Sequence, residues 1–105
     1  MPHRGKIWTE RDRYGNEVYL TWERWEDHIL PGHPTMEGQL EKVRRTIQEG
    51  RRWQDPLNPN RYHYRLWDVD LPEDYNCIVV VVIVTPAQNE RFVVTAYLDE
   101  LPERG

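Results

Sequence analysis

Residues 77–84 read Cys-Ile-Val-Val-Val-Val-Ile-Val, an unbroken apolar run in a chain of 105 residues. Branched β-carbons favour extended backbone, so the run predicts a strand. It lacks the polar alternation of a half-buried strand and therefore predicts the central, buried strand of a sheet. Segments 62–68 and 91–98 predict its neighbours, and the turn residues at 71–74 and 85–90 join all three segments into an antiparallel meander.

The N-terminal half predicts a hairpin and two helices. Segments 6–10 and 17–21 predict strands, with turn residues at 12–16 between them. Thr21 is suited to cap a helix that begins at Trp22 and ends by Leu30, since Pro31-Gly32 cannot continue it. A second helix should begin at Pro34, carry one apolar face and end at Gly50. The residues of that face are Met36, Leu40, Val43 and Ile47. Residues 51–60, with two prolines, predict a loop.

These elements predict an α+β domain: an N-terminal β-hairpin, two helices, then a three-stranded antiparallel β-meander with the helices packed on one sheet face. The length fits a single domain over 1–105. Its ordered core should span about residues 6–98, between short polar tails.

Composition excludes several classes of protein. The single cysteine, Cys77, rules out an intrachain disulfide and a Cys-based zinc site. There is no apolar stretch of about 18 residues, so we expect no membrane span. Residues 1–5 lack the apolar core of a signal peptide, which favours a cytoplasmic protein.

The charge is unevenly distributed along the chain. A net charge of −4 argues against nucleic-acid binding over the whole surface. Residues 42–65, however, hold seven basic and two acidic side chains, a local charge of +5. Two interpretations stay open: a solvated helix face followed by a loop, or a local anion-binding surface.

Two histidines stand out in the tryptophan-rich segment 22–34. His28 lies in the predicted first helix, and His33 lies just past its end. Imidazole is the side chain best suited to proton transfer near neutral pH. The alternatives are structural: His28 as a core-edge histidine bonded to backbone, and His33 as a helix cap. Zinc binding by these two and His63 is disfavoured, because metalloprotease helices space their histidines four residues apart, not five. No metal or cofactor is expected.

Several short motifs follow one another in a suggestive order. They are Trp25-x-x-His28-Ile29, His33-Pro34, Tyr62-x-Tyr64-Arg65, the Val-rich strand and Val94-Thr95-Ala96-Tyr97. This order, over residues 18–98, resembles the phage and mobile-element nuclease domains of the fold group shared by barnase, EndoU, tRNA-cleaving colicins and RelE-type toxins. The resemblance implies metal-independent cleavage of RNA, in which a ribose 2′-hydroxyl attacks the neighbouring phosphate and leaves a cyclic phosphate. RNA or tRNA would be the substrate, and an antitoxin or immunity protein a natural partner.

The resemblance also implies roles for individual residues. His28 or His33 would serve as base or acid, and Arg65 would stabilise the charge on phosphorus. Thr95 and Tyr97, on one side of the last strand, would orient phosphate or carry a proton. Each has a structural alternative, such as a carboxylate partner for Arg65 or simple strand preference for Thr95 and Tyr97. The expected substrate-binding residues are Arg44, Arg45, Arg52, Arg61 and His63.

The competing hypothesis is a non-catalytic interaction module on the same scaffold, similar to an antitoxin or immunity protein. The acidic C-terminal third of the chain would then dock a basic partner by charge complementarity.

Overall fold

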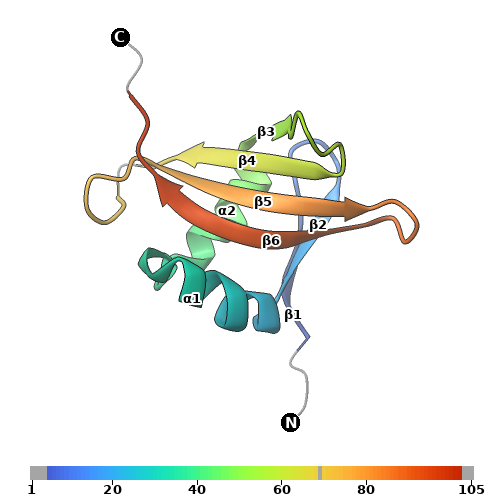
Figure 1. Ribbon diagram of the computed structural model, residues 1–105, viewed down its shortest axis with the longest axis horizontal. Helices are drawn as coiled ribbons and strands as arrows, with labels where there is room; N and C mark the ends of the chain where they lie inside the picture. The colour runs from blue at the N-terminus through green and yellow to red at the C-terminus, as the bar shows by residue number, and fades with distance from the viewer. Residues whose placement is uncertain (1–4, 69, 103–105) are drawn as a thin grey trace.

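A computed structural model describes residues 5–68 and 70–102, and its six strands form one mixed sheet (Figure 1). The strands are β1 (Lys6–Arg11), β2 (Glu17–Thr21), β3 (Arg51–Gln54), β4 (Arg61–Trp67), β5 (Cys77–Thr85) and β6 (Glu90–Asp99). Their order across the sheet is β1-β2-β6-β5-β4-β3. Residues 1–4 and 103–105, which belong to the predicted polar tails, lie outside the described residues.

The predicted three-stranded meander is wrong, because the meander has four strands and the hairpin belongs to the same sheet. Residues 51–54, expected in a loop, form β3 and pair antiparallel with β4. The hairpin joins through a parallel bridge between Tyr19 of β2 and Phe92 of β6, whose ring centroids lie 5.9 Å apart. Both additions depend on contacts between segments distant in sequence, which periodicity does not report.

The helical region is more broken than predicted. A π-helical segment, η1 (Arg24–Ile29), continues into α1 (Leu30–Gly32), two residues beyond the expected end. The side-chain hydroxyl oxygen of Thr21 accepts a hydrogen bond from the backbone amide of Arg24 at 3.1 Å, which confirms the expected cap. The single helix expected from Pro34 is instead a short 3₁₀ turn, η2 (Pro34–Met36), followed by α2 (Leu40–Glu49). Gly38 separates them with a φ of +84°, which an α-helix cannot contain.

The helices and the sheet enclose one core. In Figure 1, α2 lies behind strands β4 and β5, and α1 lies beside β6. Alternate residues of β5 point toward α2 and join the core, as expected for a pleated strand. The fully buried core includes Val18, Leu20, Ile29, Met36, Val43, Ile47, Ile78, Val80 and Val82. Each such side chain contributes about 1.5–3 kcal/mol to stability through burial. This core layer therefore holds the sheet, including its opposite face, in place. None of the helices within the described ranges is long and apolar enough to cross a bilayer.

A buried carboxylate ties the hairpin to the meander. Asp12, in the β1–β2 turn, accepts hydrogen bonds from the amides of Tyr14 and Asn16 at 2.9 and 2.8 Å. It also accepts one from the Tyr64 hydroxyl at 2.5 Å and lies 3.6 Å from the Arg52 guanidinium. Burial, followed by the contact with Asp12, raises the pKa of Tyr64 above its ordinary range.

Candidate functional site

The face of the meander that points away from α2 carries basic side chains, and we call it the open face. Along β4, Tyr62, Tyr64 and Leu66 pack on the core side. The alternation of a strand therefore places Arg61, His63, Arg65 and Trp67 on the open face. The strand thus has two chemically different faces.

Two of the predicted site residues on β6 share this face. In the register of the sheet, Arg65 lies opposite Val79, and Val79 lies opposite Tyr97. In the same way, His63 and Thr95 flank Val81. Adjacent strands are about 4.8 Å apart, so about 10 Å separates the backbones of Arg65 and Tyr97. That separation suits two long side chains that approach one ligand group from either side.

Arg65 is available for a ligand. Its guanidinium lies 4.5 Å from the ring centroid of Trp53, which orients it by a cation–π contact. Within residues 5–68 and 70–102, no carboxylate forms an ion pair with Arg65 or Arg61. The Nε atoms of both arginines are buried and lack a hydrogen-bond partner in this part of the chain. The donors that the open face offers to an anion are therefore the terminal guanidinium nitrogens of Arg61 and Arg65, which no carboxylate of the described residues neutralises.

His63 is held in place from two sides. Its ring stacks on Trp53 with centroids 5.0 Å apart and planes inclined by 11°. Its Nε2 lies 3.1 Å from Oδ2 of Asp55. The Leu57 amide, and next the contact with His63, lower the pKa of the Asp55 carboxyl, so Asp55 stays ionised and anchors the imidazole.

His33 meets Tyr97 at the margin of the open face. Their ring centroids lie 5.7 Å apart, with planes inclined by 33°. His33 follows α1 directly, so the end of that helix sets its position beside β6. Burial and next Asp99 raise the pKa of Tyr97, although the charge of Arg65 opposes the shift. Tyr97 therefore stays protonated near neutral pH and remains a hydrogen-bond donor.

His28 lies elsewhere. It lines a separate hollow of about 230 Å³ with residues of β2, of the helix and of the start of β6, including Phe92. Phe92 and Tyr97 are five residues apart on β6, which corresponds to about 17 Å of strand. The structure therefore brings His33, Arg65, Thr95 and Tyr97 onto one face but does not bring His28 to them.

The basic residues predicted to bind substrate are divided between the two sides of the sheet. Arg61 and His63 lie on the open face. Arg44, on α2, pairs with Glu10 and lies 3.9 Å from Glu41.

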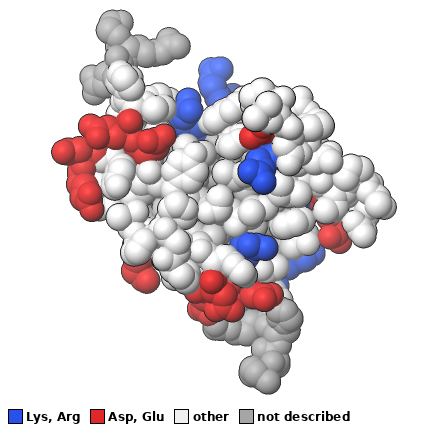
Figure 2. Space-filling model, viewed as in Figure 1, with Lys and Arg blue, Asp and Glu red and all other residues white. Residues whose placement is uncertain are grey.

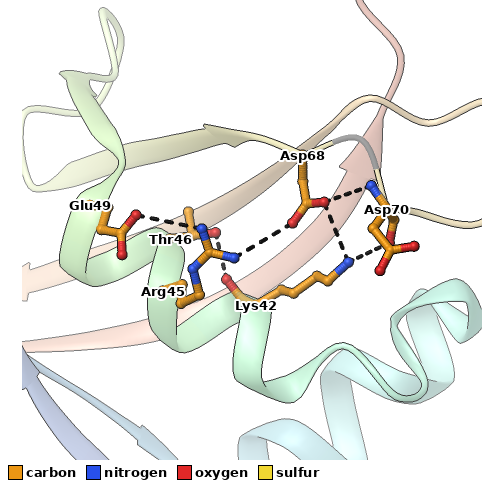
Figure 3. Close-up of polar contacts among 6 residues, drawn as sticks. All are labelled: Lys42, Arg45, Thr46, Glu49, Asp68 and Asp70. Carbon is orange, nitrogen blue, oxygen red and sulfur yellow. Dashed lines mark hydrogen bonds and ion pairs between the residues drawn. The ribbon is translucent and has the colours of Figure 1, made fainter.

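Arg45 is also held on α2, and Arg52 on the core side of β3. Arg45 pairs with Glu49 at 3.6 Å and with Asp68 at 3.9 Å, beside Lys42, as Figure 3 shows. Arg52 pairs with Asp12 and lies over the rings of Tyr14 and Tyr62. Much of the positive charge of residues 42–65 thus serves to fasten α2 and β3.

Apart from Asp55, which contacts His63, most acidic residues on this side lie toward its margins. Figure 2 shows this side of the molecule as largely uncharged, with scattered Lys and Arg. Asp and Glu gather beside the loop that joins β4 to β5 and along the lower margin. The net charge of −4 therefore does not describe the local surface.

The sequence analysis did not identify Trp53 and Asp55 as candidate functional residues, because both lie in the segment predicted as a loop. The alternation of Arg51 and Trp53 before the Asp-Pro turn is the one signal that indicates an edge strand there. Within the described part of the chain, no group of three or more His, Cys, Asp or Glu side chains is arranged to hold a metal ion. The chain matches no protein-family model, no curated protein and no solved structure.

Proposed function

We propose that the protein is a ribonuclease-like domain that cleaves RNA by attack of a ribose 2′-hydroxyl on the neighbouring phosphate. The observation that carries this proposal is that Tyr97 shares the open face with Arg65, which has no carboxylate partner among the described residues, and that the His33 ring lies against Tyr97. The reaction needs a base, a cation for the extra negative charge on phosphorus, and an acid for the leaving oxygen.

The three groups suit these three tasks. The forked guanidinium of Arg65 matches two phosphate oxygens. The His33 imidazole is the natural base for the 2′-proton. Tyr97, whose pKa is raised, would donate a hydrogen bond or a proton to the leaving 5′-oxygen. Thr95, next but one along β6, would orient the phosphate with its hydroxyl.

The scaffold supports the proposal more broadly. A sheet face without a helix over it, across which Arg65 and Tyr97 lie, would give a nuclease of the barnase–EndoU–colicin–RelE group a place to bind RNA. In that setting the protein would act as a toxin or as a nuclease of a mobile element, with RNA or tRNA as substrate. Arg61 would contact a further phosphate along β4.

A direct assay tests the function. Purified protein is incubated with total RNA or tRNA in EDTA, and the products are separated on a gel and analysed for cyclic phosphate ends. We expect discrete fragments with such ends, and their loss in His33→Ala and in Tyr97→Phe. Arg11→Ala is the matched control, because Arg11 lies in an exposed pair with Glu17 in the hairpin. Intact RNA after incubation with the wild type would rule out the nuclease proposal.

A second candidate is an interaction module of the antitoxin or immunity type. The acidic residues beside the β4–β5 loop favour it, because such a margin can guide docking to a basic nuclease. Capture of a stoichiometric basic partner, disrupted by Glu73→Lys with Asp74→Lys, would support this function if the RNA assay is negative. Capture that both substitutions leave unchanged would reject it.

A further inference from the structure

Two exposed indoles line a hollow at the edge of the sheet, which we call the two-tryptophan hollow. It has a volume of about 250 Å³ and lies where β3, the outermost strand, meets β4. Its lining includes Arg13, Arg51, Trp53, Arg65 and Trp67. Trp67 is 51% exposed and Trp53 37% exposed, which is unusual for the largest apolar side chains.

The charges around this hollow are predominantly positive. Arg51 and Arg65 have no carboxylate partner within the described residues. The one acid in the lining, Glu49, directs its carboxylate to Arg45 at 3.6 Å. Its backbone oxygen accepts a hydrogen bond from Arg13 at 3.1 Å. The hollow thus combines aromatic surface with uncompensated guanidinium groups.

This combination matches one ligand chemistry in particular. Tryptophan rings and guanidinium planes are the surfaces on which unpaired nucleobases stack. The nearby guanidinium groups would contact the phosphates on either side of such a base. A base paired in a duplex cannot enter, because its faces are already stacked.

We infer that the two-tryptophan hollow is a base-stacking subsite for single-stranded RNA. The inference takes the phosphate-binding role of Arg65 from the proposed function. Arg65 can connect the two sites because it faces both the hollow and Tyr97. Three strand spacings, about 14 Å, separate β3 from β6. The RNA would therefore cross the strands, with its reacting phosphate between Arg65 and Tyr97 and a neighbouring base against Trp67.

The test uses RNA that the protein cannot cleave. Single-stranded oligonucleotides with 2′-O-methyl groups lack the attacking hydroxyl, so fluorescence anisotropy reports binding alone. One version is intact, one has abasic positions, and one is a duplex. We expect wild-type protein to bind the intact single strand at least about tenfold more tightly than the abasic strand, as base stacking on aromatic rings predicts. The duplex should bind as weakly as the abasic strand.

Matched variants assign the effect to the hollow. Trp67→Ala should weaken binding of the intact strand about tenfold, and Trp67→Phe should retain most of it. Neither change should alter binding of the abasic strand. Leu57→Ala is the control, since Leu57 is 93% exposed and lies outside the hollow. Circular dichroism checks that each variant folds.

The outcomes separate this inference from the proposed catalysis. Equal binding of intact and abasic strands by wild-type protein would overturn the inference, and that comparison requires no variant. Unchanged binding by a folded Trp67→Ala protein would overturn it as well. Cleavage of ordinary RNA without base-dependent binding would support the nuclease proposal and refute the subsite. Base-dependent binding without cleavage would support the subsite and refute the nuclease proposal.

Discussion

Substitution of Arg65 is the sharpest perturbation of the proposed site. The guanidinium lies on the open face without a carboxylate partner in the described chain, so Arg65→Ala leaves no buried acid uncompensated. The main structural loss is its cation–π contact with Trp53, worth about 0.5–1 kcal/mol. The variant should therefore fold with nearly the stability of the wild type.

The expected effect on catalysis is far larger. Removal of one preorganised donor to a developing negative charge typically costs about a hundredfold to a thousandfold in rate, or about 2.7–4 kcal/mol. Arg65→Lys should fall between Ala and wild type, because lysine keeps the charge but cannot form two parallel hydrogen bonds or stack on Trp53. The ratio of the rate losses in Arg65→Ala and Arg65→Lys separates the contribution of the positive charge from that of the guanidinium geometry.

The assay compares kcat/KM for a fluorogenic RNA oligonucleotide with urea unfolding of the same preparations. Arg11→Ala, which removes an exposed arginine of the hairpin, should match the wild type in both measurements. Activity of Arg65→Ala within threefold of the wild type would refute the assignment of Arg65. A fall in kcat/KM accompanied by an equally severe loss of folding would refute the argument that Arg65 acts on the substrate and not on the fold.

Three further results are expected. Tyr97→Phe should lower kcat about a hundredfold or more with little change in KM, as measured by steady-state kinetics, because it removes a proton donor and leaves the ring. Ile47→Ala should lower the free energy of unfolding in urea by about 2–5 kcal/mol, because Ile47 is fully buried between α2 and the sheet. The pKa of Tyr64 is raised in the folded protein, so above pH 10 the unfolded chain loses this proton first and stability falls as pH rises. Tyr64→Phe should make the alkaline decline shallower by about 1.4 kcal/mol per pH unit in urea titrations; an unchanged slope would contradict the buried Asp12–Tyr64 contact.

Local sequence predicts the elements that depend on their own composition. The run from Cys77 becomes β5, near the middle of the sheet and almost entirely buried, because branched apolar side chains favour extended backbone and burial. The alternation along β4 also holds, with Tyr64 inside and Arg65 outside. In these two strands the structure follows the pattern of the sequence.

Elements whose position depends on distant contacts are not predictable in this way. β3 reads Arg-Arg-Trp-Gln, in which the alternation of Arg51 and Trp53 is only a weak strand signal, and it pairs with β4 with Trp53 stacked on His63. The break before α2 depends on the backbone of Gly38, a residue that an isolated helix can tolerate at modest cost. Local composition therefore does not predict the position of β3 or the break before α2.

The pair of histidines shows the same limit within one segment. His28 lies in the π-helical segment and lines the hollow beside Tyr19 and Phe92. The helix continues to Gly32, and His33 follows its end with non-helical backbone, which places that ring against Tyr97. Closeness in sequence favours a joint site, whereas in the structure only His33 contacts Tyr97.

The division of the basic segment explains how an acidic protein can present an anion-binding face. Arg44 and Arg45 on α2 form ion pairs with Glu10, Glu49 and Asp68. Their charges are therefore neutralised in contacts that hold the helix in place. Of the residues that alternate onto the other side, Arg61 and Arg65 meet no such acid in the described chain, whereas His63 between them contacts Asp55. Coulomb interactions are screened beyond about 10 Å at ordinary salt, so acids at the margin weaken the field at the centre only slightly. A ligand above β4 therefore experiences the local guanidinium groups, and the strand's two-residue period determines which charges remain free to bind it.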